Sequence, residues 1–165
     1  DDIIVVVNKK QTDITSYFSD KCTFAYQDKQ IGTANALACA EEHIDDRFLL
    51  INADEFIPKT DIEKFANNKN YSMAVSSVSN PEKFGVVETN NSIVANIVEK
   101  PAKQKSNLVR CGMEVLDAKI FPLIKKIKTS PRGEIELPDA YHLLMKEDEI
   151  KVFPVSKWIT LSYPW

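Results

Sequence analysis

The chain has 165 residues, 44% of them hydrophobic, and 21 Lys and Arg against 24 Asp and Glu give a formal net charge of −3. These values are ordinary for a soluble protein and predict one globular domain over residues 1–165. The mild acidity argues against nucleic-acid or membrane-surface binding, which needs a dense field of Lys and Arg, and no stretch approaches the roughly 20 apolar residues needed to cross a bilayer.

The first half of the chain alternates predicted strands and helices. Residues 3–7 and 48–51 are continuous apolar runs, which are typical of strands buried on both faces. Thr33 is expected to cap a helix that begins there. The predicted strands are residues 3–7, 22–26, 48–51 and 71–78, and the predicted helices are residues 12–18, 33–44 and 61–67. This order is typical of βαβ units and predicts a largely parallel sheet with helices on both faces.

The second half changes character. Residues 84–88 and 93–99 flank a polar turn at residues 89–92, which predicts an antiparallel hairpin. The remaining predicted strands are residues 108–116, 150–155 and 158–161, and the remaining helices are residues 119–128 and 135–146. The predicted fold class is therefore α/β, with a Rossmann-like, mostly parallel mixed sheet flanked by helices and an inserted antiparallel portion.

Glycine and cysteine usage narrows the possible chemistry. The four glycines are scattered, whereas a loop that wraps phosphates needs several close together. Neither GxGxxG nor GxxxxGK[ST] occurs, so this chain contains no classical dinucleotide-binding or P-loop motif. The three cysteines lack CxxC spacing and only two histidines are present, which argues against a zinc site and favours reduced thiols in a cytoplasmic protein.

The first candidate site residue is Asp54, which follows the predicted strand at residues 48–51. Ligands of a parallel sheet gather beyond the carboxyl ends of its strands. A carboxylate there can hold Mg²⁺, a cation that prefers oxygen ligands and substrate phosphates. The alternative is a surface acid or the cap of a turn.

Glu99 and Lys100 end the predicted strand at residues 93–99, and as neighbours they point to opposite sides. Glu99 can accept hydrogen bonds from sugar hydroxyls while Lys100 meets a phosphate as a point charge. The alternative is a solvated charge pair before Pro101.

Gln27, Gly32 and Thr33 precede or open the predicted helix at residues 33–44. A side-chain amide can read the edge of a base, and a glycine lets backbone N–H groups approach a ligand closely. The alternative is a loop glycine followed by a helix cap.

In this order along the chain, the segments resemble the sugar-1-phosphate nucleotidyltransferase family, which includes glucose-1-phosphate thymidylyl- and uridylyltransferases and archaeal relatives with a C-terminal left-handed β-helix. The resemblance covers nearly the whole chain, and all four glycines fall inside matching motifs. The matching stretches are Gln27 with residues 32–34, residues 48–54, residues 80–87, residues 99–101, residues 106–108 with residues 111–112, and residues 133–140. Residues 158–165 stand where the family has a tryptophan, a metal-binding Asp and a Gly-x-Pro turn.

The resemblance implies the nucleotide-diphospho-sugar transferase fold, whose antiparallel portion binds the sugar. It implies a reaction of sugar-nucleotide biosynthesis, in which a sugar-1-phosphate attacks the α-phosphorus of a nucleoside triphosphate and pyrophosphate leaves. It also implies assembly into a homo-oligomer. The implied site residues are Gln27, Gly32 and Thr33 for the nucleotide, Gly85, Glu99 and Gly112 for the sugar, Asp54 and Lys100 for catalysis, and Asp54 and Thr160 for Mg²⁺.

The chain departs from the family pattern at three positions. Ala53 stands in place of the glycine before the metal-binding Asp, Thr160 in place of the second metal-binding Asp, and Ser162 in place of the following glycine. A hydroxyl can ligate Mg²⁺ but brings no negative charge. We also expect the family's N-terminal strand and Gly-rich loop to precede residue 1, and a C-terminal extension to follow residue 165.

These departures keep two alternatives to an enzyme open. One is a non-catalytic regulatory or scaffolding relative that retains nucleotide or sugar binding. The other is a plain binding or assembly module without a small-molecule ligand. The identities of the base and the sugar depend on pocket shape, which the sequence leaves undetermined.

Overall fold

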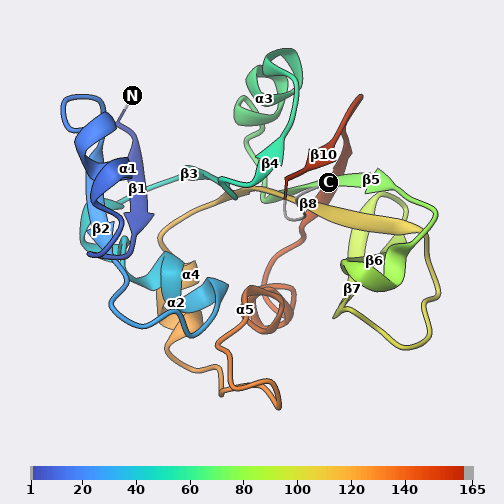
Figure 1. The fold of residues 1–165 in the computed structure, drawn as a ribbon. Helices are drawn as coiled ribbons and strands as arrows, with labels where there is room; N and C mark the ends of the chain where they lie inside the picture. Colours follow the sequence, from blue (N-terminus) through green and yellow to red (C-terminus); the bar gives the residue numbers. More distant parts are fainter. Residues whose placement is uncertain (1, 162–165) are drawn as a thin grey trace. The chain divides into compact units, whose positions relative to one another are not determined.

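The structure is a computed structural model that describes residues 2–161, and it divides the chain into two compact units (Figure 1). Unit 1 spans Asp1–Asp46 and Ala118–Ala140, and unit 2 spans Arg47–Asp117 and Tyr141–Trp165. Within the described residues, no helix is long and apolar enough to cross a membrane.

Unit 1 contains a parallel pair of strands, β1 (Ile4–Val7) and β2 (Thr23–Tyr26), with helix α1 (Thr12–Tyr17) between them in the chain. It continues with α2 (Thr33–Ala38), the short 3₁₀ helix η1 (Glu41–His43) and α4 (Ile120–Ile124). The predicted elements are present, but β1 is not buried on both faces as predicted. Val7 is buried, whereas Ile4, Val5 and Val6 are only partly covered.

The predicted helix at residues 33–44 is shorter than expected and begins differently. Gly32, not Thr33, is the N-cap residue of α2, so the prediction of Thr33 as the cap is wrong. The Thr33 hydroxyl instead accepts a hydrogen bond from the Leu137 backbone N at 3.2 Å. After Ala38 the backbone tightens into i→i+3 hydrogen bonds, such as Ala40 N to Leu37 O, and this ends the α-helix.

Unit 2 is built on a six-stranded sheet in the order β3-β8-β5-β9-β7-β6. Its strands are β3 (Phe48–Ile51), β5 (Ser72–Ser77), β6 (Gly85–Asn90), β7 (Ile93–Glu99), β8 (Leu108–Leu116) and β9 (Lys151–Pro154). The α/β class and the mixed sheet are confirmed, but the parallel share is smaller than predicted. Among the described pairings of this sheet, β5–β9 alone is parallel, because β8 inserts antiparallel between β3 and β5.

Strand β8 is kinked at Gly112, which has φ +65°. Met73 of β5 pairs with Glu114, yet Val75 pairs with Arg110, so Ala74 alone faces three residues of β8. Such a bulge bends a strand and lets it change partners. The half of β8 after the kink pairs with β3, and Val109 before it pairs with Val86 of β6.

The predicted hairpin is confirmed as β6–β7. Asn91 and Ser92 link the strands with φ +49° and +65°, as the type I′ turn of a tight hairpin requires. The 3₁₀ helix η2 (Pro81–Lys83) precedes it, and helix α5 (Leu137–Leu144) includes residues of both units. The predicted strand at residues 158–161 is β10 (Ile159–Thr160), which pairs antiparallel with β4 (Glu55–Phe56), a strand that was not predicted.

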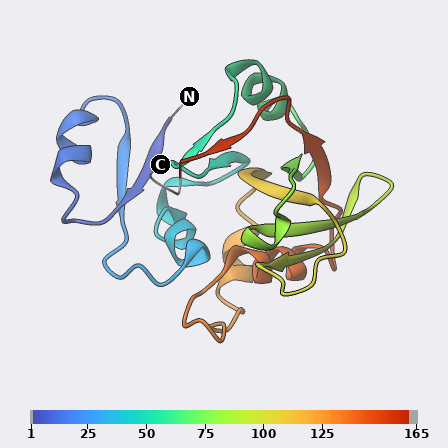
Figure 2. The same cartoon turned by 45° about the vertical axis from the view of Figure 1, so that its right-hand side comes forward.

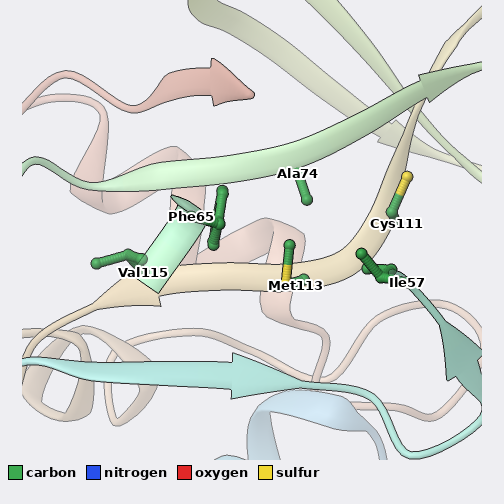
Figure 3. Close-up of a cluster of buried hydrophobic side chains, with 6 residues drawn as sticks. All are labelled: Ile57, Phe65, Ala74, Cys111, Met113 and Val115. Atoms are coloured by element: carbon green, nitrogen blue, oxygen red, sulfur yellow. The ribbon is translucent and has the colours of Figure 1, made fainter. Parts of the chain in front are cut away.

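One face of β8 carries the core of unit 2 (Figure 3). Alternate β8 residues Cys111, Met113 and Val115 pack with Phe65, which comes from α3 (Lys59–Ala66). Because side chains of a strand alternate between faces, Arg110, Gly112 and Glu114 belong to the opposite face. The polar residues discussed below therefore lie on a strand whose other side is fixed by close packing.

Candidate functional site

Asp54 and Thr160 are brought side by side. Asp54 lies exposed in the turn between β3 and β4, and Thr160 of β10 pairs with Glu55, the next residue. The Leu161 backbone N donates to the Asp54 carbonyl O at 2.7 Å. The two residues that the family resemblance assigns to Mg²⁺ thus come from chain segments about 100 residues apart. These segments meet in a two-residue ladder that contains Thr160 and begins next to Asp54.

Glu55 is a half-buried acid that the sequence analysis did not identify. The Trp158 indole Nε1 donates to its Oε2 at 2.6 Å, and the Thr160 side chain hydrogen-bonds to the same carboxyl group. Burial, reinforced by neighbouring Asp54, raises the pKa of Glu55 to about 7 although these hydrogen bonds oppose the rise. The Thr160 hydroxyl is therefore already engaged by a protein group.

Gly112 lies under the side chain of Asn52. A methyl group on Gly112 would come within 2.5 Å of Asn52 Nδ2, and the positive φ of Gly112 also disfavours any other residue. The Asn52 backbone N donates to Gly112 O at 2.8 Å. The glycine is thus explained by the close passage of the chain that leads from β3 to Asp54.

Gly85 and Glu99 are direct partners across the β6–β7 hairpin. A methyl group on Gly85 would lie 3.0 Å from Glu99 Oε2 and 2.9 Å from Arg110 Cδ. Because Gly85 has no side chain, the Glu99 carboxylate and the aliphatic part of the Arg110 side chain can both pack against it. The structure brings together these two residues assigned to the sugar, and it adds Arg110.

Arg110 belongs to a buried polar cluster with Glu114 and Tyr141. Its Nε and Nη2 donate to Glu114 Oε1 at 3.1 and 2.9 Å, and its Cζ lies 5.6 Å from the centroid of the Tyr141 ring. Burial by itself lowers the pKa of Arg110, but the Glu114, Tyr141 and Glu99 charges together raise it above its ordinary value. Tyr141 is fully buried, and burial together with the Glu114 carboxylate raises the pKa of its hydroxyl.

Lys100 is exposed at the end of β7 and has φ +45°, a conformation that costs energy for any residue other than glycine. Its backbone N donates to Phe84 O at 3.0 Å, which fixes this turn against the start of β6. Backbone strain of this kind is frequent at ligand-binding positions.

A chain of contacts in unit 2 connects these residues. The Trp158 ring, bonded to Glu55, lies edge-on to Phe84 at 5.1 Å between centroids. Phe84 precedes Gly85 and accepts the hydrogen bond from Lys100. Unit 2 therefore places the following predicted site residues on one connected set of contacts: Asp54, Thr160, Gly85, Glu99, Lys100 and, through Asn52, Gly112.

The predicted nucleotide residues lie in unit 1. The Gln27 side-chain amide donates to Gly32 O at 3.2 Å and to Asn35 Oδ1 at 2.8 Å. Gly32, with φ +117°, packs on the backbone of Ile135, where a methyl group would come within 2.3 Å of the carbonyl O. Gly32 is thus needed for a close approach between two chain segments, and Gln27 holds the loop that contains it.

Asp54 and Thr160 offer oxygen atoms, the donor type that Mg²⁺ prefers, and Mg²⁺ commonly binds through one or two carboxylates plus substrate phosphates. The residues present fit that cation in a site completed by phosphates. Within residues 2–161, no three His, Cys, Asp or Glu side chains cluster closely enough to hold a metal ion by themselves. Ser162 lies outside the described residues.

Glu55, Arg110 and Glu114 were not predicted from the sequence. A signal for two of them was available, since Arg110 and Glu114 are the charged residues of an otherwise largely apolar predicted strand at residues 108–116. Charged side chains in buried strands are uncommon unless paired. Glu55 gave no comparable signal, because its burial depends on Trp158 far along the chain.

Comparison with known proteins finds related chains of named activity. The bifunctional protein GlmU of Methanocaldococcus jannaschii is 41% identical over 170 residues, which cover 100% of this chain and 41% of that protein. The UTP–glucose-1-phosphate uridylyltransferase AglF of Haloferax volcanii is 30% identical over 176 residues, which cover 98% of this chain and 72% of that protein. The chain thus spans less than half the length of its GlmU relatives.

A solved structure supports the same relationship. A Bacillus anthracis protein assigned as a glucose-1-phosphate thymidylyltransferase, crystallised in complex with a sucrose, superimposes with a TM-score of 0.82 at 31% identity, over 96% of this chain and 70% of that one. The family model described as nucleotidyl transferase matches residues 1–159. Since this match covers nearly the whole chain, the chain belongs to the nucleotidyl transferase family.

Proposed function

We propose that this chain forms the catalytic part of a sugar-1-phosphate nucleotidyltransferase that makes a nucleotide sugar. The single observation that carries the proposal is the connected set of contacts in unit 2. It joins the Glu55–Thr160 pair, next to Asp54, to Gly85, Glu99 and Lys100 through Trp158 and Phe84. An acid beside a hydroxyl, followed by a carboxylate and a lysine, matches what phosphates and a sugar require.

In the proposed reaction, a phosphate oxygen of the sugar-1-phosphate forms a bond to the α-phosphorus of a nucleoside triphosphate. The bond from that phosphorus to the bridging oxygen breaks, and pyrophosphate leaves with the electron pair. Such transfers depend on alignment and charge neutralisation rather than on a protein nucleophile. Lys100 holds the phosphate of the sugar, and Glu99 accepts hydrogen bonds from sugar hydroxyls.

Asp54 and Thr160 hold Mg²⁺ in this proposal. When bound, Mg²⁺ supplies positive charge that offsets the charge on the phosphate oxygens. Glu55 orients Thr160 through the hydrogen bond between their side chains, and Trp158 restrains Glu55 in turn.

In unit 1, Gln27 contacts the base. Its two amide hydrogens are directed to Gly32 O and Asn35 Oδ1, so Oε1 is the atom available to accept a hydrogen bond. An acceptor at this point favours a base that offers an N–H donor.

The test is pyrophosphate release by the protein in its full natural length, with nucleoside triphosphates and sugar-1-phosphates in the presence of Mg²⁺. We expect Asp54→Asn to lower kcat by about a hundredfold or more. The substitution removes the carboxylate charge that holds Mg²⁺ in this proposal, and the transition state loses electrostatic stabilisation. Glu82→Gln changes an exposed acid of η2 and is the control, with unchanged turnover. Unchanged turnover in Asp54→Asn contradicts the proposed role of this acid.

A non-catalytic relative that retains ligand binding is the second candidate, favoured by Thr160. Its hydroxyl brings no charge and is engaged by Glu55. If the wild-type protein binds nucleotides in calorimetry but releases no pyrophosphate, and Thr160→Asp produces Mg²⁺-dependent release, this second candidate is correct. Absence of heat with every nucleotide, with and without Mg²⁺, indicates an assembly module instead.

A further inference from the structure

A buried arginine lies near two of the residues assigned to the sugar. The Arg110 side chain is 9% exposed, which is rare for a charged group. Its stem and the Glu99 carboxylate both lie against Gly85, at 2.9 and 3.0 Å from the point where a methyl group would begin. The Glu99 charge also contributes to raising the pKa of Arg110, so the two charged groups are close enough to interact.

The guanidinium group is anchored on its other side. Two of its nitrogens donate to Glu114 Oε1, and its Cζ lies over the Tyr141 ring, 5.6 Å from the centroid. Two hydrogen bonds together with a cation–π contact restrict the rotation of an otherwise flexible side chain. In the described part of the chain these hydrogen bonds engage Nε and Nη2, which leaves Nη1 with donor capacity.

Local sequence spacing does not explain why Arg110 reaches Glu114. Residues four apart in a regular strand lie about 13 Å apart, too far for a side-chain fork. The kink at Gly112 shortens this separation, and the same kink turns β8 from its pairing with β6 toward β3. The pair is therefore formed where the hairpin that contains Gly85 and Glu99 joins the rest of the sheet.

A fixed cation near a carboxylate restricts the directions in which the carboxylate oxygens point. This restriction suits recognition of sugar hydroxyl groups, which donate hydrogen bonds. We propose that Arg110 is a positioning residue of the sugar site, holding the Glu99 carboxylate against Gly85 in the orientation that accepts hydrogen bonds from the sugar.

This inference rests on the function proposed above, and the experiment separates the two. The variants are Arg110→Met with Glu114→Met, which removes the buried pair as a whole, and Arg110→Lys, which keeps the charge without the fork. Removing both partners is chosen because replacement of a buried ion pair by apolar residues is often tolerated, whereas an unpaired Glu114 destabilises the fold. Arg132→Met with Glu136→Met is the matched control, because it removes a similar hydrogen-bonded pair in unit 1.

The readouts are KM for the sugar-1-phosphate, KM for the nucleoside triphosphate and kcat, each measured on the full natural chain after circular dichroism has shown folding. We expect the double variant to raise KM for the sugar-1-phosphate about tenfold or more, because this is the effect of losing one or two charged hydrogen bonds. KM for the nucleoside triphosphate stays within about twofold. The sugar-1-phosphate KM of Arg110→Lys lies between those of wild type and the double variant. The Arg132→Met, Glu136→Met control matches wild type.

Equal sugar-1-phosphate KM values in wild type and the folded double variant overturn the role of Arg110 and leave the proposed function intact. A parallel rise in both KM values also overturns it, because that result indicates general structural damage. If the double variant does not fold, the same comparison of the two KM values is made with Arg110→Lys, and an unchanged sugar-1-phosphate KM in that variant overturns the role of Arg110. Failure of the wild-type protein to bind or use any sugar-1-phosphate is a failure of the proposed function itself.

Discussion

Two glycines of unit 1 have positive φ, but only one of them is closely packed against another segment. Gly32 has φ +117° and lies against the Ile135 backbone, whereas Gly133 has φ +81° and would have nothing within 4 Å of an added methyl group. Both positions disfavour residues with a side chain, but only Gly32 also excludes the volume of one. Comparing the same substitution at both positions therefore measures how much the close approach of Gly32 to Ile135 contributes to stability.

We predict that Gly32→Ala lowers the free energy of unfolding by about 2–5 kcal/mol, the sum of backbone strain and overpacking. Gly133→Ala is the matched control and should cost about 1–2 kcal/mol, because it carries the strain alone. Urea denaturation followed by circular dichroism measures both. Equal losses would show that the short distance to Ile135 relaxes easily and that the glycine serves another purpose, such as approach to a nucleotide.

At this scale the sequence allowed part of the site to be predicted. Asp54 and Thr160 were identified through motifs, and the structure places them together. The Arg110–Glu114 pair could not be predicted from spacing, because it depends on a kink at Gly112, where Asn52, a residue far away in the chain, packs against the backbone. The roles of the motif residues toward ligands stay predictions.

At the scale of elements, helix α3 fixes the segment that leads into β10. Asp61 of α3 is buried, and its Oδ2 accepts hydrogen bonds of 2.6 Å from both the backbone N and the hydroxyl of Ser156. Figure 2 shows the red segment between β9 and β10 beside the green helix α3. The position of Trp158 and Thr160 thus depends on a carboxylate in a different element.

The Ser156 hydrogen bonds hold the pKa of Asp61 below its ordinary value of 3.8. A depressed pKa in the folded state means that Asp61 stabilises the protein above its unfolded pKa and that this contribution disappears as pH falls through the folded pKa. We predict that Asp61→Asn is less stable than wild type at pH 7 and that the difference shrinks to near zero at pH values below that pKa.

Thermal unfolding across a pH series measures this difference. Glu63→Gln is the control on the same helix, since its exposed ion pair with Lys59 contributes little. A difference between Asp61→Asn and wild type that stays constant with pH contradicts the assignment, because a neutral hydrogen bond does not titrate in this range.

Elements were easier to predict than their arrangement. Apolar runs and the polar turn were sufficient for β1, β3 and the β6–β7 hairpin, because these signals are local. The ladder of β4 and β10 is two residues long on each side and has no periodicity to detect. The antiparallel insertion of β8 between β3 and β5 was not predicted, because strand order depends on contacts between distant segments.

At the scale of the whole molecule, family membership and the α/β fold are shown, while Mg²⁺, the single domain, the homo-oligomer and the cytoplasmic location stay predictions. The predicted nucleotide residues belong to unit 1, and the predicted catalytic and sugar residues belong to unit 2. The most direct whole-molecule test is therefore ligand binding to the folded protein, which reports on unit 1 without requiring turnover.

A nucleotide that binds the folded protein and not the unfolded chain stabilises it by about 2.7 kcal/mol at a concentration of 100 Kd. We predict that a saturating nucleoside triphosphate raises the thermal midpoint of the full natural chain by several degrees, and that Gln27→Met abolishes most of this rise. Because the rise is measured with and without nucleotide in the same variant, any change in stability caused by losing the Gln27 hydrogen bonds to Gly32 and Asn35 cancels. Glu82→Gln should show the full rise, and an equal rise in Gln27→Met would place the nucleotide away from Gln27.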